Sequence, residues 1–494
     1  MKRLFDFFRD YVLEYLLIVV VLVGVFYLAF THGSYARPVP PAEDPNYYAN
    51  KLFDQSRVHK IEIEIADESY QDLLENPLEK TKYATHVIID GEHFEDAAFS
   101  TRGNGTLGNA ASNPDTDRYS YMLNFKKFDS HNSYHGLDKL VLNSLYYEPS
   151  YLRSYLAFKL AGATGLHVPL TSFTEVYING ELSGLYLAIE AVDRSFLNRT
   201  GADADAALFH PVPYDVDADR MAHDAKFLPA GETLDPESHP DSSENTHGGS
   251  DLVYRGDAPD AYNSIFKNAS TKYSKADETL VIKGIESLSE SSLARPEEYW
   301  DINSVLQFFA ASTLALNVDS YLNYLAQNYY LEVSNGKLSL VPWDYDRAFN
   351  VNGLHAESTE WDDIISWPID SPTFNSLEDA SRPLWRIVLE DKTLLSRYHE
   401  LLQTTLDRYI YSGDCERDYN QAVELIRHYV YSDPMRLYTT EEFEDEVIYL
   451  RNYLALRTDS VQKQLWGLAP RTKGNQISDE ERLEFLDLQT VIDY

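Results

Sequence analysis

The sequence has almost no cysteine. Its 494 residues include a single one, Cys415, so the chain can form no intrachain disulfide and no cluster of thiolate metal ligands. Outside the reducing cytoplasm, a protein without disulfides is stable only if its hydrophobic core is large. With 44% hydrophobic residues, including 37 tyrosines, this chain has enough apolar material for such a core.

Positive charge is also scarce. The 42 lysines and arginines face 79 aspartates and glutamates, which gives a formal net charge of −37. Such a surface repels the phosphates of nucleic acids, so we expect no nucleic-acid partner. The charge favours a cationic partner, such as a basic, serine-rich protein substrate, but a solvated acidic surface without any partner accounts for it as well.

An uncharged apolar run extends from Tyr15 to Phe30. About 20 helical residues cross a bilayer, so we expect residues 13–31 to form a transmembrane helix. Basic residues precede it: Lys2, Arg3 and Arg9. By the positive-inside rule they predict a cytoplasmic N-terminus at residues 1–12 and an extracytoplasmic C-terminal domain, in a single-pass protein of the cell membrane.

A proline-rich linker follows at residues 32–57, and we expect it to hold the rest of the chain away from the membrane. The alternative is a cleaved signal peptide, because Ser34 and Ala36 are small residues at suitable positions for cleavage. Under either interpretation the folded part of the chain leaves the cytoplasm.

Residues 58–190 are rich in strand patterns. The segment KIEIEIA alternates, THVIIDGEHFEDAAFSTRG predicts two strands around an Asp-Gly turn, and SFTEVYING with LSGLYLAIEAV predicts a hairpin. The helical pattern EPSYLRSYLAFKLAGATG lies among them. We therefore expect a mainly antiparallel sheet with one helix packed on it.

Helical patterns dominate residues 191–470. They are interrupted at residues 201–250 by an acidic insertion rich in Asp, Pro, His and Ser, which we expect to be a surface loop. Three amphipathic helices are predicted near the end: RPLWRIVLEDKTLLSRYHELLQTTLDRYI, RDYNQAVELIRHYVY and TEEFEDEVIYLRNYLALRTDSVQKQLWG. Residues 471–494 form a C-terminal tail.

A glycine-rich turn runs from Arg102 to Asn113 between two predicted strands, the second of which ends in Lys126 and Lys127. Glycines let backbone N–H groups converge on an anion, and Arg and Lys supply compensating charge. The pattern is typical of a phosphate-binding turn, but a plain hairpin connection would look the same.

The segment from Asn317 to Asp346 holds the main candidate site. It starts at the polar end of an apolar helical pattern and continues into a predicted hairpin, NYYLEV and LSLVPW, with Asn-Gly at the turn. Polar residues lie at the ends of these apolar elements: Asp319, Asn328, Asp344 and Asp346. Buried carboxylates must be solvated, paired or metal-bound. Their oxygens suit Mg²⁺ or Ca²⁺ and one Asp is free to act as a base, although Asp after a strand is also a common turn former.

Taken in order, these segments resemble the spore-coat CotH family of atypical, protein-kinase-like proteins. The resemblance covers about Val58 to Leu465 and rests on several motifs in one order: HVIIDGEHFEDAAFSTRGNGT, LNFKKF, LNSLYYEPSYLRSYLAFKLA, VYINGELSGLYLAIEAVD, DLVYRGDAPDAY, NVDSYLNYLAQNYYL and VPWDYDRAF.

The resemblance implies an α+β, two-lobed protein-kinase-like fold behind the transmembrane helix, with a β-rich lobe at residues 58–190 and a helical lobe at residues 191–470. It implies that Asp319 is the catalytic base, accepting the proton of a substrate hydroxyl. Implied ligands of Mg²⁺ or Mn²⁺ are Asn328, Asp344 and Asp346. Implied nucleotide-binding residues are Arg102, Gly103, Gly105, Lys126 and Glu190.

The implied activity is transfer of the γ-phosphate of ATP to Ser or Thr of envelope or secreted proteins. One difference from ordinary protein kinases is that the first helix carries Arg153 and Lys159 where a glutamate is expected, which leaves Glu148 as the nearest acid. Three alternatives stay open: a catalytically inactive scaffold for envelope assembly, a calcium-dependent structural module, and transfer of AMP instead of phosphate.

Overall fold

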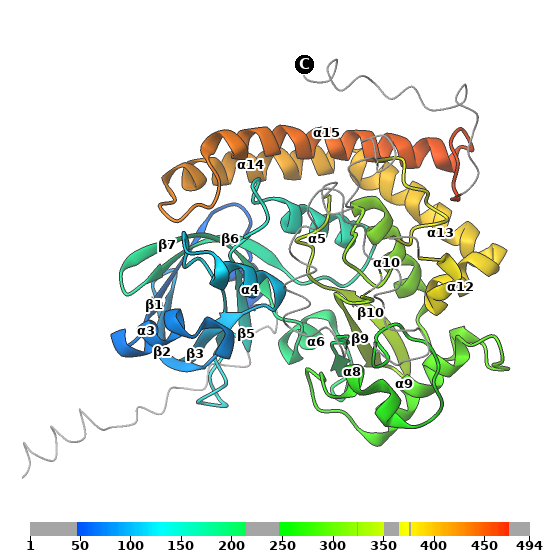
Figure 1. The fold of residues 1–494 in the computed structure, drawn as a ribbon, viewed down its shortest axis with the longest axis horizontal. Coiled ribbons are helices and arrows are strands. Elements are labelled where there is room, and N and C mark those ends of the chain that lie inside the picture. Colours follow the sequence, from blue (N-terminus) through cyan, green and yellow to red (C-terminus); the bar gives the residue numbers. More distant parts are fainter. Residues whose placement is uncertain (1–46, 214–246, 324, 350–364, 375–376, 474–494) are drawn as a thin grey trace, which may run out of the picture. The chain divides into compact units, whose positions relative to one another are not determined.

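A computed structural model of the chain describes residues 47–213, 247–323, 325–349, 365–374 and 377–473 (Figure 1). All of them belong to one compact unit, Pro45–Tyr494. The predicted membrane span and most of the acidic insertion lie outside these ranges. Within them, no helix combines the length and the apolar character that crossing a membrane requires.

The N-terminal part of the described chain forms a closed barrel with the strand order β1-β2-β3-β4-β5-β7-β6. Neighbouring strands are antiparallel, except that β1 and β6 pair in parallel and thereby close the barrel. The strands are β1 (His59–Glu64), β2 (Tyr83–Ile89), β3 (Glu92–Arg102), β4 (Ser120–Asn124), β5 (Lys139–Asn143), β6 (Thr171–Ile178) and β7 (Glu181–Glu190).

Strand β7 shows how the barrel separates two cores. Tyr186 and Ala188 belong to the core enclosed by the barrel. The alternate residues Leu185, Leu187 and Ile189 belong to a second, larger core that the barrel shares with the helices. Because successive side chains of a strand point to opposite faces, one strand contributes to both cores.

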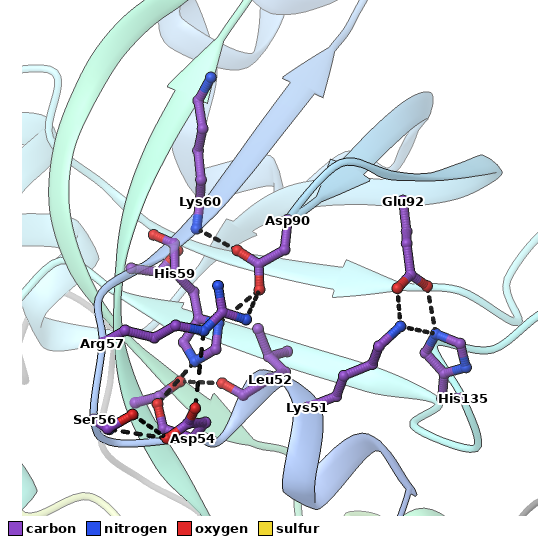
Figure 2. A network of polar contacts seen from close by, with 12 residues as sticks. Lys51, Leu52, Asp54, Ser56, Arg57, His59, Lys60, Asp90, Glu92 and His135 are labelled. Atoms are coloured by element: carbon purple, nitrogen blue, oxygen red, sulfur yellow. Dashed lines mark hydrogen bonds and ion pairs between the residues drawn. The ribbon is translucent and has the colours of Figure 1, made fainter.

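Four short elements lie against the barrel: α2 (Tyr47–Leu52), α3 (Asp67–Glu75), η1 (Pro77–Glu79) and α4 (Gly105–Ser112). Two ionic groups hold the segment around α2 to the strands (Figure 2). In one, Nδ1 of buried His59 lies 2.7 Å from Asp90 and Nε2 lies 3.0 Å from the backbone oxygen of Asp54. In the other, Lys51 contacts both Glu92 and His135.

The rest of the described chain is mainly helical and surrounds a small antiparallel sheet of order β10-β9-β8. Its strands are β8 (Ala207–Phe209), β9 (Tyr329–Ser334) and β10 (Lys337–Pro342). Its α-helices are α5 (Arg153–Ala163), α6 (Arg194–Thr200), α8 (Asn263–Phe266), α9 (Lys275–Ser287), α10 (Ile302–Ala315), α12 (Pro383–Glu390), α13 (Lys392–Thr405), α14 (Asp414–Ser432) and α15 (Thr440–Leu465). Single turns of 3₁₀ or π helix are η3 (Pro259–Tyr262), η4 (Pro296–Glu298), η6 (Asp379–Ser381) and η7 (Leu406–Ile410).

Helix α10 is at the centre of this part. Almost all of its residues are buried, and it contacts α5, α12, α13, α15 and β10. Asp301 begins it by accepting hydrogen bonds from the backbone N–H groups of Asn303 and Ser304. It ends at Leu316, whose φ of +44° is in the left-handed region. Its apolar surroundings fix its position, and therefore the position of the loop that follows.

A buried ion pair joins the barrel to the loop after α14. The fully buried guanidinium of Arg118 donates to Asp433 at 2.6 Å, to the backbone oxygen of Ser144 at 3.0 Å and to that of Leu185. Asp433 also accepts from the backbone N–H of Leu185 at 2.9 Å. Gly184, with a φ of +128°, leaves room for the pair, because a Cβ there would lie 2.5 Å from the guanidinium.

The predicted fold class is wrong. We predicted a two-lobed protein-kinase-like fold behind a transmembrane helix, but the β-rich part is a closed barrel, and no described helix is suited to span a membrane. The strand segments themselves were predicted correctly. The local pattern cannot show that β1 and β6 pair in parallel, because these strands are about a hundred residues apart in the sequence and their alternation is the same in an open or a closed sheet.

Three local predictions also need correction. Part of the glycine-rich turn is the helix α4, since Leu107 and Ala110 are spaced to bury one helical face. Residues 207–209, inside the predicted loop insertion, form β8 and pair with β9. The first predicted C-terminal helix is divided into α12 and α13, because the side chain of Asp391 caps the start of α13.

Candidate functional site

Asp319 lies three residues beyond the left-handed end of α10. Two neighbouring side-chain amides hold its carboxylate. Gln327 donates to one oxygen at 2.8 Å, and Asn328 donates to the other at 3.0 Å and to the backbone oxygen of Asp319 at 2.8 Å. Burial raises the pKa of Asp319, the Gln327 hydrogen bond and the charge of Arg347 oppose the rise, and repulsion from Asp344 adds to it. The carboxylate is therefore fixed in direction and is more basic than an exposed one.

The hairpin β9–β10 brings Asp344 and Asp346 to Asp319. The backbone N–H of Trp343 donates to the backbone oxygen of Asn328 at 3.2 Å. The residues after β10 therefore return to the start of β9. Burial and then repulsion from Asp344 raise the pKa of Asp346 well above its usual range. Arg347 opposes that rise, while Asp319 and Glu148 add to it. These residues thus interact across long sequence separations.

Glu148 completes what we call the carboxylate cluster, which consists of Glu148, Asp319, Asp344 and Asp346. Glu148 is fully buried and accepts hydrogen bonds from the N–H and the hydroxyl of Ser154 at the start of α5. Burial raises its pKa to about 7, and repulsion from Asp344 contributes. The positive charge of Arg347 opposes the rise in pKa of both Asp319 and Asp346. The guanidinium of Arg347 lies 4.3 Å from the centre of the Tyr147 ring.

The backbone around the carboxylate cluster is strained. Six non-glycine residues between positions 316 and 349 have φ in the left-handed region: Leu316, Ala326, Asn328, Asn335, Asp344 and Phe349. Such residues cost free energy and persist where the surrounding structure holds them in place. Two of them are predicted site residues, so the strain lies in the segments that bring the carboxylates together.

The turn before α4 lies beside the same cluster. The guanidinium of Arg102 is 4.9 Å from the ring of Trp343, the residue before Asp344. In the middle of α4, Asn109 donates to the hydroxyl of Tyr147, the ring that Arg347 contacts. Figure 1 shows α4 on the side of the barrel that is turned toward α5 and β10. Arg102 is therefore close to the carboxylate cluster, and Gly103 and Gly105 follow it in the same turn.

Two other predicted nucleotide-binding residues lie elsewhere. Arg102 pairs with Ser120 at the start of β4, whereas Lys126 follows the other end of this strand and forms an ion pair with Asp138 at 2.7 Å. The fully buried carboxylate of Glu190 accepts from Arg199 at 2.6–3.0 Å and from the hydroxyl of Tyr48. The described structure does not bring Lys126 or Glu190 to the carboxylate cluster.

Two further residues at the site, Gln327 and Arg347, have only weak signals in the sequence. Gln327 precedes Asn328 and looks like an ordinary loop amide in the sequence. Arg347 follows Asp346 directly, and a cation directly after two acids in the sequence is a sign that could have been used. The half-buried His210 stacks on Tyr330 at 4.3 Å near Arg102; burial, then the charge of Arg102, lowers its pKa to about 3.

Metal binding was predicted for Asn328, Asp344 and Asp346. Among the described residues, no three His, Cys, Asp or Glu side chains are grouped as ligands of one metal ion. Mg²⁺ usually takes one or two carboxylates and completes its shell with water and substrate phosphate, so it needs no larger protein cage. The donor set of two carboxylates and an amide fits that requirement, and the mutual repulsion of the carboxylates is of the kind that a cation relieves.

A family model described as CotH kinase protein matches residues 99–461. The inner spore coat protein H of Bacillus subtilis (strain 168) is 23% identical over 355 residues, which is 70% of this chain and 86% of that protein. A solved HipA–HipB–operator DNA complex of a Shewanella oneidensis MR-1 toxin–antitoxin system matches over 81% of this chain and 79% of the other, with a TM-score of 0.31 and 11% identity, a likeness too low to carry an argument. Because the family model spans most of the sequence, the chain belongs to the CotH family.

Proposed function

We propose that this protein is an ATP-dependent protein kinase that transfers the γ-phosphate to Ser or Thr of other proteins. One observation carries the proposal: three carboxylates separated by up to 27 residues meet beside Arg102, and one of them, Asp319, is held by two amide donors. Phosphoryl transfer requires positioned groups and compensated charge more than a reactive side chain. Membership of a family described as CotH kinase protein agrees with this function.

In this mechanism, Asp319 accepts the proton of the substrate hydroxyl as the hydroxyl oxygen bonds to the γ-phosphorus. The bond from that phosphorus to the bridging oxygen breaks, and ADP leaves with the electron pair. Gln327 and Asn328 each donate to one oxygen of the carboxylate, which fixes its orientation and leaves each oxygen a lone pair that could accept the proton. The raised pKa of Asp319 favours proton transfer, because a base whose pKa is closer to neutral pH accepts and holds the proton more readily.

Asp344 and Asp346, with the amide of Asn328, would hold Mg²⁺ or Mn²⁺. The ion, when bound, supplies charge that stabilises the phosphate oxygens in the transition state. Arg102 faces the same region from the barrel and would bind phosphate. A basic, serine-rich protein is the substrate that the net charge of −37 favours.

The test is transfer of label from γ-labelled ATP to a basic, serine-rich peptide, with Mg²⁺ or Mn²⁺. We expect the wild-type protein to transfer label and Asp319→Asn to be slower by roughly 10²–10⁴-fold, because the amide cannot accept the proton. Asp344→Ala should also lose activity. Asp391→Asn is the matched control, since it makes the same charge change at the exposed start of α13 and Asn still caps a helix.

Two results would argue against the proposal. If folded wild-type protein transfers no label with either metal ion, the protein is not a kinase under these conditions. That result would favour the alternative of a catalytically inactive scaffold. If Asp319→Asn transfers label at the wild-type rate, Asp319 is not the base. Label found as AMP with α-labelled ATP, and not with γ-labelled ATP, would identify AMP transfer.

A further inference from the structure

Lys80 and Arg102 have an unusual charge environment in this acidic protein. Several cations with little exposure pair with carboxylates at 2.6–2.7 Å, as Arg118, Arg199 and Arg255 do, and the buried Arg457 donates to several backbone oxygens instead. Within the described ranges, neither Lys80 nor Arg102 has an ion pair. The ammonium of Lys80 donates to the side-chain oxygen of Asn104 at 2.8 Å, and Arg102 lies over Trp343.

The two cations also repel each other. Burial, and then the positive charge of Arg102, lowers the pKa of Lys80. Their positions are fixed, because the hydroxyl of Thr101 at the end of β3 donates to the backbone oxygen of Pro77 at 2.5 Å and so joins η1 to this strand. A fold that places two cations together without an acid raises its own energy unless an anion from outside is bound between them.

The pair adjoins the carboxylate cluster. Trp343, which Arg102 covers, is followed by Asp344, and Asn104, which Lys80 contacts, belongs to the same turn as Arg102. Positive charge is therefore next to the place where the proposed function needs a metal ion and phosphate. A polyphosphate bound to a divalent ion at the carboxylates extends naturally to cations on the neighbouring wall.

We propose that Lys80 and Arg102 together bind the phosphate groups of the nucleotide, and that Lys80 has the role that the sequence suggested for Lys126. This inference rests on the proposed function. The sequence did not single out Lys80, because it lies about twenty residues before the glycine-rich turn, at the end of η1. Only the folded barrel brings it to Asn104.

The experiment measures binding of ATP with Mg²⁺, and of adenosine, to the purified full chain by calorimetry. Lys80→Gln removes the charge and keeps a donor for Asn104, and Lys82→Gln is the matched control because Lys82 is exposed two residues further on. We expect Lys80→Gln to weaken ATP binding about tenfold or more, in line with the loss of one hydrogen bond to a charged group. Adenosine binding should not change, and Lys82→Gln should bind both ligands as the wild type does.

Stability without ligand separates an anion-binding role from a structural one. We expect the thermal midpoint of Lys80→Gln without ATP to equal or exceed that of the wild type, because the variant removes a repulsion. A clear drop in the midpoint, with ATP affinity unchanged, would mean that Lys80 only supports the turn and would overturn the inference. Arg102→Gln should weaken ATP binding in the same direction.

The outcomes also distinguish this inference from the proposed function. If the wild type transfers label from ATP and Lys80→Gln has wild-type affinity for ATP, the inference about Lys80 fails and the kinase function stands. If the wild type binds neither ATP nor adenosine and transfers no label, the proposed function fails and the inference fails with it.

Discussion

Two of the buried groups of charges in the described part of the protein differ in how the fold compensates them. A guanidinium nitrogen of Arg118 lies 2.6 Å from a carboxylate oxygen of Asp433. Backbone groups form further hydrogen bonds with both side chains. The carboxylate cluster, by contrast, contains four acids and fewer cations: the charge of Arg347 acts on Asp319 and Asp346, and that of Arg153 acts on Glu148. The first group is complete within the fold, and the second has an excess of negative charge.

The difference indicates what each group is for. A buried pair with all its hydrogen bonds made has no use for a ligand, and removing one partner leaves a charge that nothing compensates. A group of like charges held by strained backbone lowers stability and is retained where a ligand supplies the missing charge. We therefore assign Arg118–Asp433 to the fold and the carboxylate cluster to function.

The largest expected effect is at the complete pair. Arg118→Met should lower the free energy of unfolding by about 3–5 kcal/mol, because Asp433 is left buried without its cation. Urea denaturation measures this. Arg417→Met is the matched control, since it breaks an exposed ion pair with Asp414 and should cost less than about 1 kcal/mol.

The double variant Arg118→Met, Asp433→Leu sharpens this prediction. If the cost arises from an uncompensated charge, the second substitution should recover part of the stability lost by the first. A cost for Arg118→Met no larger than that of the control would mean that the pair does not hold the barrel to the loop after α14.

Glu332 in β9 is a third kind of site, a buried acid whose carboxylate has no ion pair or hydrogen bond within the described ranges. Burial, followed by repulsion from Asp203 and Asp301, raises its pKa to about 7. The folded state thus holds the proton more tightly than the unfolded state, so stability is full at low pH and is lost as pH rises through about 7. Glu332→Gln should match the wild type near pH 4 and exceed it by about 2 kcal/mol at pH 8.

Unfolding of both proteins in urea across this pH range tests the prediction. The difference between the two free energies is the informative quantity, because other groups titrate in both. A difference that stays constant from pH 4 to pH 8 would show that Glu332 ionises normally in the folded protein.

A smaller effect, of opposite sign to that at Arg118, is expected at Asp346. Burial and the neighbouring carboxylates raise its pKa, so its ionised form destabilises the folded protein at neutral pH. Asp346→Asn should therefore raise the free energy of unfolding by about 1 kcal/mol at pH 7 while label transfer from ATP is lost. The gain should disappear at acidic pH, where the aspartate is protonated in both states. A variant that is less stable than the wild type at pH 7 would place Asp346 among the structural residues.

How much of the structure can be predicted from the sequence depends on whether a feature is specified by neighbouring residues or by contacts between distant segments. The Asn-Gly turn and the alternation of apolar residues identified the hairpin β9–β10 and the barrel strands, because those signals are local. The closed barrel was missed because strand patterns do not show which strands pair. Asp319, Asp344 and Asp346 were singled out by their places at the ends of apolar segments, and the structure brings these three together.

Two predicted site residues lie away from the carboxylate cluster for a related reason. Lys126 was chosen as a cation near the glycine-rich turn in the sequence, but β4 carries it to the opposite end of the strand from Arg102. Glu190 was placed at the site by the family resemblance, but its carboxylate is bound by Arg199 and Tyr48. Lys80 comes close to the turn only when η1 packs beside α4, a contact for which the sequence has no pattern.

The central claim is that a bound ligand, and not the fold, compensates the carboxylate cluster. The most direct test is the thermal midpoint of the wild type and of Asp344→Asn, each with and without ATP and Mg²⁺. A ligand at a hundred times its dissociation constant stabilises the folded state by about 2.7 kcal/mol, so we expect the wild-type midpoint to rise by several degrees and that of the variant to stay almost unchanged. No rise in the wild type, or an equal rise in both proteins, would contradict the claim.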